Sequence, residues 1–192
     1  MPKRRLIIPK ALKDRLLAEY NHRCSICGGD RPQIHHIDEN PENNVLLNLL
    51  PLCPNHHLND QHNPTTKIEP LRLSLFRKYK DPQILSPQFE PLYKRIKYLL
   101  TRSGEESFES LSNFAADLVK FTEYLEMGSY YSKRFWAFLD WSIPSGYPTD
   151  QAESVMAEHH RKYHKRLDGC TDRVIELVVE MLRYQKWPTY KA

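Results

Sequence analysis

The sequence predicts an α+β fold, in which a small N-terminal domain with two short strands is followed by an α-helical domain. Three observations support this prediction. Two pairs of metal-ligand residues lie within residues 24–57, prolines and glycines divide the same region into short segments, and apolar residues recur at helical spacing from residue 91. We therefore divide the chain into a domain at 1–65, a proline-rich connector at 66–90 and a helical domain at 91–192.

The first domain is expected to begin with a helix over residues 9–20, where Leu12 and Leu16 lie four residues apart on one face. Farther along, closely spaced prolines leave room only for a brief hairpin and one short helix. The strand-like segments of this hairpin are residues 33–37 and 45–47.

The remaining elements are predicted to be helices. In the connector, residues 71–79 lie between prolines and form a short helix. In the helical domain, apolar residues recur at three- and four-residue spacing. The expected helices are 91–101, 105–127, 130–141, 150–168 and 170–187, with Gly169 separating the last two.

The distribution of charge favours nucleic-acid binding by the first half of the chain. Residues 1–100 carry sixteen Lys and Arg and ten Asp and Glu, whereas residues 101–192 carry twelve and fourteen. Basic residues displace counterions from phosphates, although a solvated surface with a slight lysine excess is an equal alternative. No apolar run approaches the ~20 residues that span a bilayer, and the apolar stretch near the N-terminus is too short for a signal peptide. We therefore expect a cytoplasmic protein without membrane contact.

Two residue pairs with matching spacing predict a structural metal site. Cys24 and Cys27 are separated by two residues, and Cys53 and His56 repeat this spacing. A tight turn with this spacing presents both side chains to one ion, and two such pairs fill the four tetrahedral positions that zinc prefers. Such a closed site would stabilise a domain too small to hold together by apolar burial alone. Unliganded cysteines in a loop are the alternative interpretation.

Three further histidines, His35, His36 and His57, exceed what one tetrahedral ion can bind. Adjacent side chains of a strand point to opposite sides, so His35 and His36 are not expected to perform the same task. One of them can bind a metal ion while the other acts as a general base, a role suited to an imidazole with a pKa of ~6.5.

Over residues 10–61, about a quarter of the chain, the sequence resembles the HNH nuclease domains that are bracketed by zinc-binding Cys-x-x-Cys pairs. The matching elements are Cys24-x-x-Cys27, His35-His36-Ile37, Asn48-Leu49 with Pro51-Leu52-Cys53 behind it, and the closing His57. The resemblance implies a ββα-metal fold, in which a hairpin and a helix hold one divalent ion. It also implies metal-dependent hydrolysis of DNA.

The resemblance implies a role for each matching residue. His36 would be the general base that takes a proton from the attacking water, and His35 and His57 would hold the catalytic ion, Mg²⁺ or Mn²⁺. Asn48 would brace the loop and keep the His36 ring oriented. The products would carry a 5′-phosphate and a 3′-hydroxyl.

The sequence departs from the family pattern at His56, where the family usually has cysteine. Zinc accepts imidazole nitrogen readily, so a Cys3His site remains a conservative interpretation. The assignment of the neighbouring His57 to the catalytic ion rests on position alone, and the two histidines could exchange roles.

Other polar residues carry weaker signals. The candidate phosphate contacts are Arg4, Arg5, Lys10 and Lys13, although a charged helix face is an equal alternative. We interpret four other histidines as surface residues, namely His22, His62, His160 and His164. The fourth cysteine, Cys170, is interpreted as a small buried residue.

The preferred hypothesis is a DNA endonuclease, and the alternative is a nucleic-acid-binding module that is stabilised by zinc and has no catalytic activity. The helical half has no recognisable chemistry but carries aromatic residues, which are favoured at protein interfaces: Tyr130, Tyr131, Trp136, Trp141 and Trp187. We therefore expect it to bind a protein, either a second copy or a regulatory or sensor subunit, as in bacterial anti-phage defence systems. A self-contained helical bundle is the alternative.

Overall fold

The structure is a computed structural model that describes residues 7–142 and 152–186. It is α+β, as the sequence predicts, with a small two-stranded sheet among many helices. The chain forms two compact units, residues 1–85 and 86–192, and each contains its own buried apolar core.

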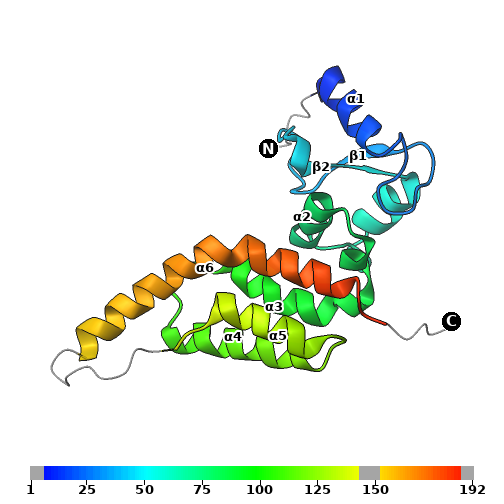
Figure 1. Cartoon of the computed structure of the whole chain (residues 1–192). Helices are drawn as coiled ribbons and strands as arrows, with labels where there is room; N and C mark the ends of the chain where they lie inside the picture. Colours follow the sequence, from blue (N-terminus) through cyan, green and yellow to red (C-terminus); the bar gives the residue numbers. More distant parts are fainter. Residues whose placement is uncertain (1–6, 143–151, 187–192) are drawn as a thin grey trace. The chain divides into compact units, whose positions relative to one another are not determined.

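The first unit carries the sheet. Its elements are α1 (Lys10–Glu19), β1 (Gln33–His36), the 3-10 turn η1 (Leu46–Asn48), β2 (Leu49–Leu52), the π-helix η2 (Asn55–Gln61), α2 (Pro70–Tyr79) and the 3-10 turn η3 (Pro82–Leu85). The helices predicted at 9–20 and 71–79 are confirmed to within one residue. Helix α1 packs against β2, and α2 packs against η1 and η3 (Figure 1).

The second strand lies later in the chain than the sequence predicts. Residues 45–47 were expected to be extended, but the antiparallel partner of β1 is Leu49–Leu52, which contains Pro51. Because the Ile37 amide bonds to the Asn48 carbonyl, the alternation of the ladder leaves Pro51 at a position where no N–H is needed. All four residues of β2 are buried, which outweighs the low strand propensity of proline.

An ion pair between a buried arginine and a partly exposed glutamate joins the two long helices of the first unit. Arg77 of α2 is 2% exposed, and its guanidinium donates to both carboxylate oxygens of Glu19 at 2.8 and 2.7 Å. Lys80 lies 2.6 Å from the same carboxylate. The hydrogen bond from Arg77, together with the nearby charge of Lys80, lowers the pKa of Glu19 to about 2.

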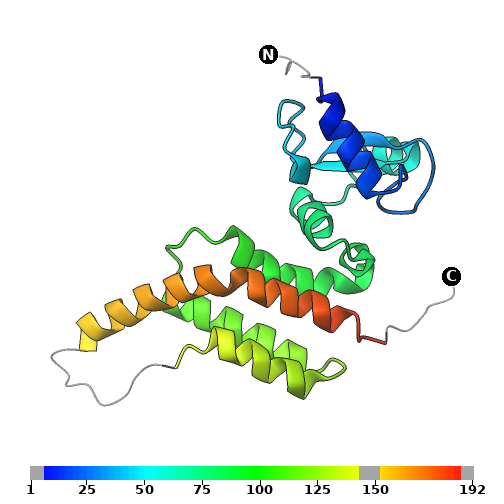
Figure 2. The same ribbon diagram turned by 45° about the horizontal axis from the view of Figure 1, so that its top comes forward.

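The second unit is a four-helix bundle within its described residues. The helices are α3 (Glu90–Thr101), α4 (Phe108–Glu123), α5 (Gly128–Leu139) and α6 (Ala152–Leu182), preceded by the 3-10 turn η4 (Pro87–Phe89). Helices α3 and α5 each pack against both α4 and α6, as the two views in Figures 1 and 2 show. The bundle core includes Tyr131 and Phe135 of α5, both fully buried.

The predicted break at Gly169 is wrong, because α6 runs through this position as one helix of 31 residues. A glycine inside a helix costs only about 1 kcal/mol relative to alanine. Buried residues on both sides, among them Leu167 and Val174, hold the helix on the bundle and outweigh that cost. No helix within the described ranges is long and apolar enough to cross a membrane.

Candidate functional site

The predicted ligands Cys24, Cys27, Cys53 and His56 come together in a cluster that could hold a metal ion such as zinc, with ligand atoms all within 4.8 Å of one another. Cys27 Sγ is 3.7 Å from Cys53 Sγ, and His56 Nδ1 is 3.2 Å from Cys53 Sγ. His56 Nδ1 is also 3.5 Å from Cys24 Sγ. Two sulfurs bound to one tetrahedral zinc at about 2.3 Å are about 3.8 Å apart, so the cluster has the size that zinc requires.

Local backbone geometry explains why the two pairs converge. Gly28 has a φ of 70° and closes the turn after Cys27, where the Gly28 amide bonds to the Cys24 carbonyl at 2.9 Å. A Cβ at Gly29 would lie 3.2 Å from Cys27 Sγ, so a larger residue at this position would crowd the thiol. The second pair spans the junction between β2 and η2, which carries Cys53 and His56.

Groups around the cluster suit metal binding. Burial raises the pKa of the Cys24 thiol, but backbone hydrogen bonds from Cys27, Cys53 and Ile26 outweigh burial, so this pKa lies below its ordinary value. On the far side of the His56 ring, Nε2 lies 3.8 Å from a carboxylate oxygen of Asp60. A carboxylate in this position orients a metal-bound imidazole and increases its basicity.

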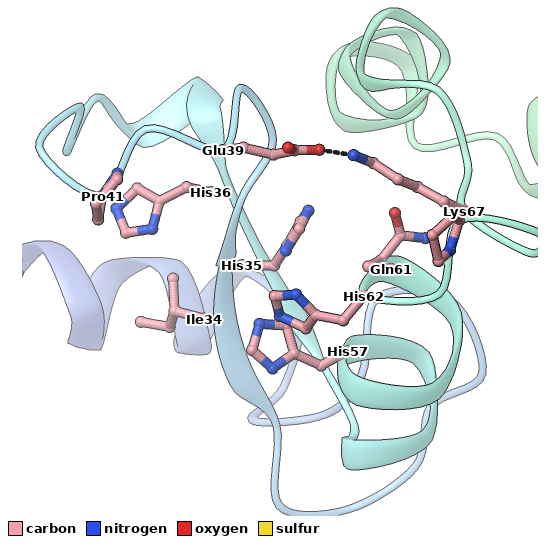
Figure 3. A pocket seen from close by; sticks show the side chains of 10 residues that line it. Ile34, His35, His36, Glu39, Pro41, His57, Gln61, His62 and Lys67 are labelled. Atoms are coloured by element: carbon pink, nitrogen blue, oxygen red, sulfur yellow. Dashed lines mark hydrogen bonds and ion pairs between the residues drawn. The ribbon is translucent and has the colours of Figure 1, made fainter. Parts of the chain in front are cut away.

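A pocket of about 640 Å³ lies in the same unit, between β1 and the helix η2 (Figure 3). Most of its side chains are polar. The lining residues are Ile34, His35, His36, Glu39, Pro41, His57, Gln61, His62, Pro64 and Lys67. All three histidines that remained after the zinc assignment therefore line one pocket, which the sequence could not establish.

His35 is the most buried histidine of the pocket, with 6% of its surface exposed. Its ring lies 5.5 Å from the ring of His57, measured between centroids. Burial, together with the neighbouring imidazoles of His57 and His62, lowers the pKa of His35 to about 4. The ring is therefore neutral at pH 7, which is the form that binds metal ions.

His57 is held by a residue from the strand. Its Nδ1 lies 2.6 Å from Oε1 of Gln33, so the hydrogen of a neutral His57 is on Nδ1 and its lone pair is on Nε2. This arrangement is the usual one for a histidine that binds a metal through Nε2. Gln33 is a supporting residue that sequence reasoning missed.

His62 also belongs to this pocket, although its side chain is exposed. Its ring centroid lies 4.9 Å from that of His57 and 6.5 Å from that of His35. Residues five apart face different directions in an α-helix, but the π-helical winding of η2 brings residues five apart onto one face. The five-residue spacing of His57 and His62 would have indicated that they share a face only if the π-helix could have been predicted from the sequence.

His36 points to the other side of β1 from His35, yet it lines the same pocket (Figure 3). Its Nε2 lies 3.0 Å from Oδ1 of Asn44. Because that oxygen accepts, the hydrogen of a neutral His36 is on Nε2 and its lone pair is on Nδ1.

Asn48 braces the loop that leads to Asn44. Its amide donates to Asp38 at 2.8 Å and to the Asn43 carbonyl at 2.9 Å, and its carbonyl accepts from the Asp38 amide at 3.0 Å. Burial raises the pKa of Asp38, but hydrogen bonds from Asn43, Asn40 and Asn48 outweigh it and lower this pKa. The hydrogen-bond partner of the His36 ring is therefore Asn44, whereas Asn48, which was expected to orient this ring, bonds to Asp38 and to Asn43, the residue before Asn44.

The candidate phosphate contacts are only partly described. Lys10 and Lys13 are exposed on α1, whereas Arg4 and Arg5 lie outside the described residues. Lys67, which lines the pocket and forms an ion pair with Glu39, is a further basic residue near the site (Figure 3).

The other histidines and the fourth cysteine have simpler environments. His22 is exposed and Cys170 is buried, as expected. His160 and His164 of α6 are half-buried, and the Nε2 atom of each lies within 3.0 Å of the Glu106 carbonyl. These two histidines therefore connect α6 to the segment before α4.

Comparisons of the chain with models of known protein families, with curated proteins and with solved structures return no match.

Proposed function

We propose that this chain is a metal-dependent DNA endonuclease of the HNH type. The observation that carries the proposal is the pocket lined by His35, His36 and His57, beside the Cys3His cluster. These are the three histidines to which the sequence resemblance gives catalytic roles. Their order along the chain and their convergence on one pocket are independent observations, and both support the same chemistry.

In the proposed reaction, Nδ1 of His36 takes a proton from a water molecule. The water oxygen forms a bond to the phosphorus of a DNA phosphodiester, the bond to the 3′ oxygen breaks, and the 3′ oxygen takes a proton from solvent water. The products are a 5′-phosphate and a 3′-hydroxyl. Asn44 keeps the hydrogen on Nε2 of His36 and so leaves Nδ1 as the basic atom.

The donor set of the pocket fits a divalent ion. His35 is neutral and Gln33 holds His57 with its lone pair on Nε2, so both can act as ligands; His62, whose ring centroid lies 4.9 Å from that of His57, is the candidate for a third. Imidazole nitrogen suits first-row transition metals better than Mg²⁺, so we expect Mn²⁺ to support activity better than Mg²⁺. When bound, the ion supplies positive charge that stabilises the departing 3′ oxygen.

Zinc in the Cys3His cluster would have a structural role. The cluster joins the segment before β1 to the junction of β2 and η2, so it fixes the helix that carries His57 and ends directly before His62. A bound zinc with four protein ligands offers no position to a substrate.

Incubation with supercoiled plasmid in Mn²⁺, Mg²⁺ or EDTA tests the proposal. An endonuclease converts the plasmid to nicked or linear forms in the presence of the ion and not in EDTA. The alternative is a nucleic-acid-binding module that is stabilised by zinc. Such a protein retards DNA in a gel without cutting it in any of the three conditions. His57→Ala is expected to abolish cutting while the zinc is retained.

A further inference from the structure

Gln61 is a polar residue in the pocket whose side chain has no partner. It is 3% exposed, and both its amide nitrogen and its amide oxygen are buried without a hydrogen bond among the described residues. Figure 3 shows it on the helix side of the pocket, across from His35 of β1. An unsatisfied buried polar group costs about 1–3 kcal/mol, so the fold retains this amide at a cost in stability.

The chemistry of an amide limits what the partner can be. Gln61 offers N–H donors on one atom and an acceptor on the other, and both atoms are unsatisfied. A cation alone would satisfy the oxygen and leave the donors buried. A phosphodiester with its accompanying water satisfies both, because a phosphate oxygen accepts and the water donates.

The charges around the pocket allow an anion to enter. Glu39 is the only acidic residue among those that line the pocket, and it is paired with Lys67 (Figure 3). The remaining polar lining residues are histidines and Gln61, none of which carries a negative charge.

We infer that Gln61 is a phosphate-contacting residue. Its Nε2 donates to a non-bridging oxygen of a bound phosphodiester, and its Oε1 accepts from a water molecule that enters with the phosphate. The inference rests on the proposed function of the same pocket and adds to it a substrate contact outside the HNH residues.

Two measurements test the contact without relying on cleavage. The first is the thermal unfolding of Gln61→Leu without DNA, which is expected to occur at or above the wild-type temperature because an unsatisfied amide is removed. The second is the affinity for a short DNA duplex, measured by fluorescence anisotropy with Mn²⁺ in a His36→Ala background that does not cut.

In this background, Gln61→Leu is expected to weaken duplex binding roughly ten- to a hundredfold, the range for a lost hydrogen bond to a charged group. Gln61→Glu is expected to weaken it at least as much, because a carboxylate cannot donate and repels phosphate. Mn²⁺ affinity without DNA, measured by calorimetry, should be unchanged in Gln61→Leu. Asn59→Ala, which removes an exposed amide on the same helix, is the matched control and should change neither affinity.

Unchanged duplex affinity in Gln61→Leu would overturn the inference. So would a loss of Mn²⁺ binding in Gln61→Leu that Gln61→Glu restores, because Gln61 would then be a metal ligand. A change confined to duplexes of one base composition would show a contact to bases and also overturn it. If the wild-type protein binds the duplex through Gln61 but never cuts DNA, the contact stands and the proposed nuclease function fails.

Discussion

The Nε2 atom of His36 lies 3.0 Å from Oδ1 of Asn44, a residue eight positions later in the loop between the strands. This hydrogen bond selects the neutral tautomer with a basic Nδ1. It also connects the proposed base to Asn48, which holds the same loop through Asp38 and the Asn43 carbonyl.

Asn44 is therefore expected to be a positioning residue. Asn44→Ala should lower kcat about tenfold or more with little change in KM, because the ring loses its preferred tautomer and orientation. Asn44→Asp should recover much of the rate and shift the acidic limb of the pH–rate profile upward, since a carboxylate stabilises the protonated ring. A purely structural role would not produce this shift, and an unchanged pH profile in an active Asn44→Asp would contradict the assignment.

The two groups of metal ligands should separate by metal analysis. Purified protein is expected to hold about one zinc per chain, and Cys24→Ser or Cys53→Ser should lose both the zinc and thermal stability. His57→Ala should keep the zinc, whereas His56→Ala should lose it or bind it weakly. Elemental analysis together with thermal unfolding measures both quantities. If His57→Ala removes the zinc and His56→Ala does not, the two histidines have exchanged roles.

The Glu19–Arg77 ion pair should make the first unit sensitive to acid. The pKa of Glu19 is about 2 in the folded chain, below its ordinary value of 4.5, so the stabilisation is complete above about pH 4.5. It is lost as the pH falls from there toward 2. Glu19→Ala removes the carboxylate partner of the buried Arg77 and should lower the free energy of unfolding at pH 7 by about 1–3 kcal/mol.

Urea unfolding at pH 7 and pH 3 measures this difference, which should shrink at the lower pH. The exposed pair between Arg23 and Asp30 provides the control, because Asp30→Ala should change the free energy of unfolding by less than about 1 kcal/mol at either pH. An effect of Glu19→Ala that is equally small would mean that the ion pair contributes little.

The helical unit is expected to bind a second protein chain. Tyr131 is fully buried in the bundle, but Tyr130 and Trp136 of the same helix are 49% and 37% exposed, and Trp187 lies outside the described residues. Trp136 also lines a cavity of about 450 Å³ with residues of α4 and α5. Light scattering of the full chain should detect self-association that Trp136→Ser weakens. A strictly monomeric protein that cleaves DNA fully would contradict this expectation for a second copy.

Sequence reasoning predicted the Cys3His cluster well because its signal is local. The spacing of each ligand pair, Cys24 with Cys27 and Cys53 with His56, is set by a short turn. Each pair can therefore be recognised in the sequence without knowledge of the other pair. The position of β2 was missed because burial and ladder register, which are tertiary effects, made Pro51 acceptable in a strand. The contribution of His62, five residues after His57, depends on the π-helical winding of η2, and no pattern in the chain predicts this winding.

Plasmid cleavage with Mn²⁺ tests the central claim most directly. The proteins to compare are the wild type, His36→Ala and His22→Ala. His22→Ala is the control, because it changes an exposed histidine outside the pocket. The wild type and His22→Ala should cut at equal rates in Mn²⁺ and not in EDTA. His36→Ala should cut roughly 10²–10⁴-fold more slowly while its zinc content and thermal unfolding stay unchanged. Wild-type cutting rates in His36→Ala, or a zinc-loaded wild type that cuts no DNA with Mn²⁺ or Mg²⁺, would contradict the account.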